Sequence, residues 1–291
     1  MSTPELIRPR LRDLGGGFTV RRLLPSLPTQ GVGPFVFFDH MGPITTRPGD
    51  NHDVRPHPHI GLSTVTYLFD GAILHRDSLG SVQRIEPGAI NWMTAGSGIV
   101  HSERAPEDLR GKTYGMHGLQ LWAALPKPLE ETDPAFFHTP AAELPTWSQP
   151  GIRARVLIGN AFGLASPVKT YSATLYVDIA AGAETALTLP SDPSHPRFER
   201  AVYSVDHPIV VDGADVPSFT MAVLAPGTDT TIVAPRGARY VVIGGEPLDG
   251  QRTLWWNFVS SSKERIERAK ADWQAQRMGS IPGEHEWIPL P

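Results

Sequence analysis

Two short motifs contain the residues of this chain that are most suited to metal chemistry. The first is His57-Pro58-His59, and the second is His101-Ser102-Glu103. In each motif the two metal-capable side chains are two residues apart, so on a β-strand they would point to the same face. If the two strands lie side by side inside a small barrel, we expect three imidazoles and one carboxylate to surround a single divalent ion.

The sequence between these motifs predicts short antiparallel strands joined by tight turns. Val, Ile, Thr, Tyr and Phe are frequent in it, and the breaks contain Gly next to Asp, Leu, Pro or Ser. Two hairpins are predicted, one of residues 63–69 and 73–77, the other of residues 81–86 and 89–94. Residues 34–38 are a predicted strand that ends in a turn at residues 39–43. Such a series can close into a barrel whose first and last strands are neighbours.

Strand patterns continue through most of the chain and indicate an all-β protein with two domains. Residues 127–150 are rich in proline and have no sustained period, so we expect them to connect the two halves. We place the domains at residues 1–135 and 136–291. A helical pattern is confined to the C-terminal region, where Ser261-x-x-Glu264 is a predicted capping box. The side chains of Ile266, Ala269 and Trp273 then fall on one face, which predicts a helix packed on the outside of a barrel.

The second half repeats the turn pattern of the first without its metal-capable residues. Asp70-Gly71 and Pro87-Gly88 have counterparts in Asp212-Gly213 and Pro226-Gly227. Aligning these turns places Glu199 and Ala201 at the positions of His57 and His59. The same alignment places Tyr240 and Val242 at the positions of His101 and Glu103. We therefore expect a second barrel that lacks metal ligands.

Composition excludes several classes of site and partner. The 291 residues include no cysteine, so disulfides, iron–sulfur clusters and thiolate zinc sites are excluded, and a metal must be held by nitrogen and oxygen. The net charge of −4 gives no sign of a nucleic-acid-binding surface. No apolar segment predicts a signal peptide near the N-terminus or a membrane span. We therefore expect a cytoplasmic protein.

The two motifs in their wider context, His57-Pro58-His59-x-Gly61 and Gly96-x-Gly98-Ile99-x-His101-x-Glu103, resemble the pirin family of the cupin superfamily. The segments at residues 92–96, 117–122 and 255–258 are also similar to that family. The resemblance implies an all-β fold of two tandem cupin-type antiparallel β-barrels, a bicupin with a C-terminal helix, and iron in the N-terminal barrel. It implies the metal ligands His57, His59, His101 and Glu103. In other cupins the acidic ligand follows the paired histidines, but here Leu62-Ser63-Thr64 contains no acid.

Three histidines and one glutamate would leave two positions of an octahedron open, as in non-haem iron(II) oxygenases. We therefore favour Fe(II), with nickel, manganese, cobalt, copper and zinc left open because affinity alone does not select among them. The resemblance implies a quercetin 2,3-dioxygenase that opens a flavonol-like small molecule with O₂, with Glu103 as the candidate catalytic carboxylate. The alternative is a metal- and redox-sensing regulator that acts by binding a protein partner. An isomerase is less favoured because the first half shows no additional acid–base pair.

The remaining polar residues near these motifs have weaker claims. A lone histidine is more often a surface or core residue than a ligand, and we treat His75 and His138 in that way. Asn91, His117 and Gln120 are candidates for supporting or lining the site. Trp92 and Trp122 are expected in the barrel core.

Overall fold

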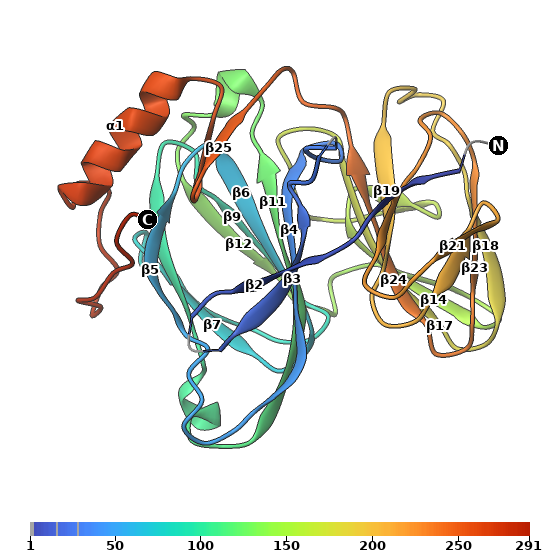
Figure 1. Ribbon diagram of the computed structural model, residues 1–291, viewed down its shortest axis with the longest axis horizontal. Coiled ribbons are helices and arrows are strands. Elements are labelled where there is room, and N and C mark those ends of the chain that lie inside the picture. The colour runs from blue at the N-terminus through green and yellow to red at the C-terminus, as the bar shows by residue number, and fades with distance from the viewer. Residues whose placement is uncertain (1–2, 16, 28) are drawn as a thin grey trace. The chain divides into compact units, whose positions relative to one another are not determined.

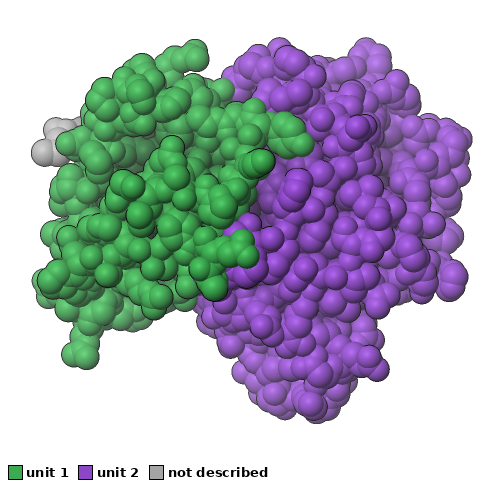
Figure 2. All heavy atoms as spheres, turned by 180° about the vertical axis from the view of Figure 1, so that it is seen from behind, with its two compact units in different colours: residues 1–11, 21–38, 142–247 green, residues 12–20, 39–141, 248–291 purple. Residues whose placement is uncertain are grey.

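The computed structural model describes residues 3–15, 17–27 and 29–291, and nearly all of its regular structure is β-strand. The chain divides into two compact units, coloured separately in Figure 2. The histidine unit consists of residues 12–20, 39–141 and 248–291, and the second unit consists of residues 1–11, 21–38 and 142–247. The all-β prediction is confirmed. Among the described residues, no helix is long and apolar enough to cross a membrane.

The two motifs lie in a four-stranded sheet with the order β5-β10-β7-β8. A seven-stranded sheet with the order β12-β9-β6-β11-β4-β3-β2 accompanies it. The bounds of these strands are β2 Arg10–Asp13, β3 Thr19–Leu24, β4 Phe35–Thr46, β5 Val54–His59, β6 Leu62–Asp70, β7 Ile73–Asp77, β8 Val82–Ile85, β9 Ile90–Thr94, β10 Ile99–Arg104, β11 Tyr114–Ala124 and β12 Ala135–Thr139. Two short 3₁₀ helices, η1 Glu107–Leu109 and η2 Lys127–Leu129, flank β11.

Both predicted hairpins are wrong, although their strands exist. β6 pairs with β9 and β11, whereas β7 pairs with β8 and β10, so the chain leaves one sheet and enters the other at Gly71. Gly71 has a φ of 83°, and a Cβ atom there would lie 2.3 Å from the carbonyl oxygen of Gly115. The backbone therefore bends sharply at this corner, where a hairpin turn would instead return it along β6. The expected turn at residues 39–43 is also wrong, because β4 continues through it.

The second unit repeats this arrangement strand for strand. Its sheets have the orders β1-β22-β19-β24-β17-β14-β13 and β18-β23-β20-β21. In chain order, β18 to β24 occupy the places that β5 to β11 occupy in the other sheets. The bounds are β1 Glu5–Ile7, β13 Thr146–Gln149, β14 Ile152–Ile158, β15 Asn160–Ala161, β16 Leu164–Ala165, β17 Thr174–Ala181, β18 Thr185–Leu189, β19 Glu199–Ser204, β20 Ile209–Val211, β21 Ala214–Val216, β22 Met221–Val223, β23 Thr230–Ala234 and β24 Arg239–Gly245.

This topology corrects the alignment of the two halves made from the turns. Glu199 lies on β19, which corresponds to β6, and Tyr240 lies on β24, which corresponds to β11. The turn at Asp212-Gly213 joins β20 to β21 and so matches the β7–β8 turn, one strand later than the alignment assumed. The strands that correspond to β5 and β10 are β18 and β23.

The compact units do not follow the sequential division into residues 1–135 and 136–291, because the two ends of the chain are exchanged. β1 pairs with β22 of the second unit, and the C-terminal segment packs in the histidine unit. The expected connection at residues 127–150 also contains regular structure, since β12 pairs with β9 and β13 pairs with β14. The sequential division stays a prediction about the domains as sequence segments.

The C-terminal helix α1, Lys263–Gln274, covers strands of the histidine unit (Figure 1). It begins one residue later than predicted, because the side chain of Ser262 accepts a hydrogen bond from the Arg265 backbone N–H at 3.2 Å. Its predicted buried face is confirmed, since Ile266, Ala269 and Trp273 pack in one apolar cluster with Ile60, Val100 and Phe258. Just before the helix, β25 Thr253–Trp255 and β26 Phe258–Ser260 form a small hairpin that contacts it. The helix therefore lies over the ends of β5 and β10.

Candidate metal centre

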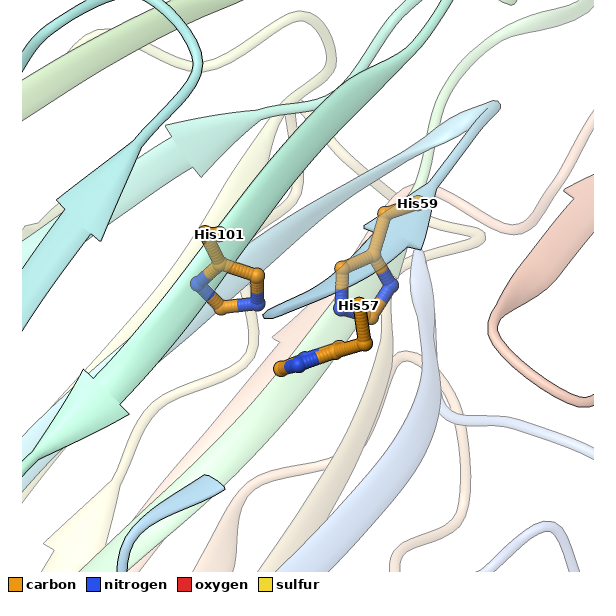
Figure 3. Close-up of side chains that lie close together, drawn as sticks. All are labelled: His57, His59 and His101. Carbon is orange, nitrogen blue, oxygen red and sulfur yellow. The ribbon is translucent and has the colours of Figure 1, made fainter. Parts of the chain in front are cut away.

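The histidines of the two motifs meet because β5 and β10 are antiparallel neighbours. In this ladder His101 lies directly opposite His57, and Ile99 lies opposite His59. Each of the three histidines offers a ring nitrogen, and these atoms all lie within 4.8 Å of one another. Figure 3 shows the three rings turned toward a common point. The pairing of the ladder therefore produces the convergence that the two-residue spacing predicts.

The outer nitrogens of two rings are fixed by backbone carbonyls. His57 Nδ1 lies 2.8 Å from the carbonyl oxygen of Arg55, and His59 Nδ1 lies 3.1 Å from that of Asn257. A carbonyl oxygen only accepts hydrogen bonds, so each Nδ1 must carry the proton and each Nε2 must carry a lone pair. Ligand histidines in metal sites are oriented by this kind of bond. The two carbonyls thus select the tautomer that a metal requires.

The inner nitrogens provide the test of fit for a metal ion. The Nε2 atoms of His59 and His101 are buried and have no hydrogen-bond partner among the described residues. A buried polar atom without a partner is costly, and such atoms in folded proteins usually mark a ligand or a functional group. A divalent cation among the three imidazoles would satisfy them, and these residues therefore fit a metal ion.

Burial also keeps the three rings neutral. It lowers the pKa of His57 to about 4, although the hydrogen bond that His57 donates to the Arg55 carbonyl acts in the opposite direction. The pKa values of His59 and His101 are held well below the usual value, first by burial and then by the neighbouring imidazoles. At neutral pH all three rings are therefore neutral imidazoles, which is the form that binds metals.

A histidine–carboxylate pair on β7, which the sequence reasoning missed, supports His101. The Nδ1 atoms of His101 and His75 lie 3.4 Å apart, and His75 Nε2 lies 2.9 Å from Asp77 Oδ2. Asp77 is completely buried, and its Oδ1 accepts hydrogen bonds from the backbone N–H groups of Leu79 and Ser81. Burial alone would raise the pKa of Asp77, but its bonds to His75 and Ser81 outweigh burial and lower it.

The ionised carboxylate of Asp77 determines the tautomers of His75 and His101. Asp77 can only accept, so His75 Nε2 carries a proton and His75 Nδ1 is an acceptor. His101 must then donate from Nδ1, which leaves its Nε2 lone pair free. The signal in the sequence was the two-residue spacing of His75 and Asp77, which places both on one face of β7.

Glu103 lies on the same strand as His101 but outside the cluster of three. Its neighbours Ser102 and Arg104 bind Glu284 on the outer face of β10, so alternation places Glu103 on the inner face with His101. Burial raises its pKa to about 7. Its carboxylate is not among the ligand atoms that lie within 4.8 Å of one another. The structure therefore brings the three predicted histidines together, and the fourth ligand stays a prediction.

The other polar candidates of the sequence are bound elsewhere. Asn91 Oδ1 accepts a hydrogen bond from His138 at 2.7 Å, and Gln120 Oε1 accepts one from Thr66 at 2.8 Å. His117 pairs with His40, with their Nε2 atoms 2.7 Å apart. Trp122 does contact the cluster, since its ring centroid lies 5.1 Å from that of His59. These residues support the barrel wall and do not add ligands to the three histidines.

Comparison with known proteins gives matches over most of the chain. Residues 17–123 match the family model described as Pirin, and residues 175–279 match the one described as Pirin C-terminal cupin domain. The chain is 49% identical to a pirin-like protein of Caulobacter vibrioides, with 97% of each chain covered. It is 30% identical to human pirin, over 93% of this chain and 91% of that one.

A solved structure resembles the whole fold. The crystal structure of quercetin 2,3-dioxygenase from Acinetobacter baumannii superposes with a TM-score of 0.92 and 36% sequence identity, covering 99% of this chain and 95% of that one. Each half of the chain thus has a counterpart in one family, at a similarity that extends from sequence to fold. The chain belongs to the pirin family of the cupin superfamily.

Proposed function

We propose that this chain is a mononuclear metal-dependent dioxygenase that opens a flavonol ring with O₂, in the manner of a quercetin 2,3-dioxygenase. The observation that carries the proposal is the convergence of three buried, neutral imidazoles, of which His59 and His101 have unpartnered Nε2 atoms. The substrate class is supported by the 36% identity to the Acinetobacter baumannii protein described as quercetin 2,3-dioxygenase.

The metal would be held by His57, His59, His101 and Glu103, with Fe(II) as the proposed ion. Three neutral nitrogen donors and one anionic oxygen leave two octahedral positions open, which suits iron(II) oxygenase chemistry. When bound, the ion supplies Lewis acidity toward a hydroxyketone and redox reactivity toward O₂. Because nitrogen and oxygen donors also accept nickel, manganese, cobalt, copper and zinc, each of these ions belongs in the test.

The residues of the chain would supply orientation and a proton acceptor. The carbonyls of Arg55 and Asn257 and the His75–Asp77 pair hold the three imidazoles in the required tautomers. Glu103 is the carboxylate on the inner face of β10 beside His101, and one of its oxygens would take the proton from the flavonol 3-hydroxyl. The ring of Trp122 packs against His59 and shields that side of the cluster from water.

The test is O₂ consumption by the Fe(II)-loaded protein with quercetin. We expect loss of the flavonol absorption and release of one carbon monoxide for each O₂ consumed. A flavone that lacks the 3-hydroxyl should not react, because no hydroxyl proton can be removed next to the carbonyl. Glu103→Gln should lower the rate strongly, because it removes the anionic ligand and the proton acceptor together. A fully metallated protein that takes up no O₂ with any flavonol would refute the proposal and favour the redox-sensing regulator.

A further inference from the structure

The second unit contains a cavity that the proposed dioxygenase reaction does not use. It has a volume of about 580 Å³, which lies within the range of small-molecule sites in proteins. Its apolar walls include Val177, Leu189, Val242, Phe198 and Phe162, and polar side chains line the rest. The strands that form it, β17, β18, β19 and β24, are those of the barrel in this unit (Figure 1). The cavity therefore lies against strands of the second barrel.

One buried cation lies in this apolar wall. Arg200 is only 8% exposed, and it sits on β19 opposite Gly244 of β24. A Cβ atom at Gly244 would meet Arg200 Cγ at 3.1 Å, so the glycine leaves room for the arginine side chain. Val202, two residues further along β19, belongs to the apolar core of the barrel. Alternation along the strand therefore directs Arg200 to the inner side.

The guanidinium of Arg200 has donors to spare. Nη1 donates to the carbonyl oxygen of Pro190 at 2.8 Å, and Nη2 donates to that of Thr228. Arginine has five N–H donors, and the described part of the chain supplies no further acceptor and no ion pair for the other three. Burial accordingly lowers the pKa of Arg200, in spite of the charges of Asp229 and Asp212. Arg200 lines the cavity, so these N–H groups are placed to bind an anion or another hydrogen-bonding ligand there.

The nearby carboxylates are already occupied. Asp229 Oδ1 accepts hydrogen bonds from the backbone and hydroxyl of Ser191, at 2.7 and 3.0 Å. Asp192, which lines the cavity, accepts a backbone hydrogen bond from Ser194 at 2.9 Å. One free cation with these acids close by suits a monoanion better than a dianion, because a second negative charge would be repelled.

We propose that the second barrel binds a small organic acid, with its carboxylate on Arg200 and its apolar body in the cavity. The planar guanidinium fork matches a carboxylate in geometry, and the apolar walls match a ring or branched chain. This site uses none of the histidine-unit residues, so it is independent of the proposed dioxygenase activity.

The experiment compares a bromonaphthalene carboxylate with its carboxamide, which differs mainly in charge. Binding to the metal-loaded protein is measured by calorimetry, and the bromine is located by anomalous scattering in crystals. We expect the acid to bind in the cavity with its bromine among the apolar walls. The amide should bind at least about tenfold more weakly, because it cannot form the charge-assisted pair.

Two variants and a control separate the cavity from other sites. Arg200→Gln should weaken the acid at least about tenfold, whereas Arg236→Gln, at an exposed arginine of the same unit, should change nothing. Val168→Trp places a large ring in the cavity from its half-buried wall and keeps Arg200, so it should abolish binding of the acid. This variant tests the site independently if Arg200→Gln folds poorly. Equal affinity of acid and amide, an affinity insensitive to both variants, bromine located at the histidine cluster, or no binding of the acid would each overturn the proposal.

Discussion

The same pair of neighbouring strands occurs in both units with different residues on its inner face. In the histidine unit, His57 lies opposite His101 across β5 and β10. In the second unit, Leu187 lies opposite Ile232 across β18 and β23, and both belong to the apolar core. Leu189 and Thr230 form the next inward pair. The same pair of strands therefore presents three imidazoles in one unit and mainly apolar side chains in the other.

The two units differ in how these inward residues contribute to stability. Burial of the Leu187 and Ile232 side chains stabilises the second unit, so it needs no ligand at these positions. The histidines of the first unit have no such gain, because two Nε2 atoms are buried without partners. The residues that make the site useful are thus the ones that burial penalises, and the surrounding strands must hold them in place.

The largest effect is expected from removing two ligands. His59→Ala with His101→Ala should reduce the metal content from one ion per chain to none, because one imidazole cannot replace three. The matched control is His195→Ala with His207→Ala, which removes two partly exposed histidines of the second unit. Elemental analysis of the purified proteins measures this. Metal that persists in the first variant, or that disappears in the control, would contradict the assignment of the cluster.

A core substitution in the second unit is expected to lower the stability of the protein without changing its metal content. Leu187→Ala should lower the free energy of unfolding by about 2–5 kcal/mol, because it leaves a cavity in the core. The metal content should not change. His57→Ala should instead lower metal affinity, with a smaller effect on the stability of the metal-free protein, because the lost ring is polar. Urea unfolding after treatment with a chelator, together with metal analysis, checks both; equal stability losses in the two variants would remove the distinction.

A smaller effect is expected from Asp77→Asn, because Asp77 acts on His101 only through His75. An amide N–H directed at His75 Nε2 would reverse the tautomer of His75, and His101 would then have to protonate Nε2. We expect metal affinity to fall by about 10–100-fold, as for other groups that orient ligand histidines. Asp212→Asn is the control, since Asp212 directly follows the corresponding strand β20 and its carboxylate accepts the Thr231 backbone N–H at 2.8 Å. Competition with a chelator gives the affinities, and equal values for the two variants would exclude the role of Asp77.

Much of the site could be predicted from local spacing. The two-residue period of a strand is a property of neighbouring residues, so His57, His59 and His101 could be assigned to one inner face. The absence of cysteine also limited the metal ligands to nitrogen and oxygen. The family resemblance then provided the fold of two barrels.

What could not be predicted depends on pairing between distant residues. His75 became a supporting residue because β7 lies next to β10, and the carbonyl that fixes His59 belongs to Asn257, 198 residues away. Glycines such as Gly71 indicate a bend, but local sequence does not determine whether the chain returns along the same sheet or enters the other one. The failed alignment of the two halves has the same cause, since it matched turns that join different strands.

The smallest effect concerns the C-terminal segment, which covers the outer face of β10 in the histidine unit. Glu284 Oε1 accepts a hydrogen bond from Ser102 Oγ at 2.6 Å, and Oε2 accepts one from Arg104 Nε at 3.2 Å. Burial would raise the pKa of Glu284, but Arg104 and Ser102 outweigh burial and lower it. A lowered pKa means that the ionised carboxylate stabilises the fold above the unfolded-state pKa of about 4.3 and that this contribution is lost as the pH falls through the folded-state pKa.

Glu284→Gln should therefore destabilise the protein by about 1 kcal/mol at pH 7 and by progressively less as the pH falls below about 4. The loss is limited because Arg104 keeps Glu286, at 2.7 Å, as a second partner. Glu286→Gln is the matched control, and it should have a smaller effect because Glu286 is half exposed. Urea unfolding of the metal-free variants at pH 7 and at a pH below about 4 measures the free energies of unfolding. If Glu284→Gln lowers the free energy of unfolding equally at low and neutral pH, the charge of Glu284 makes no contribution. Acid would then destabilise the protein through other groups.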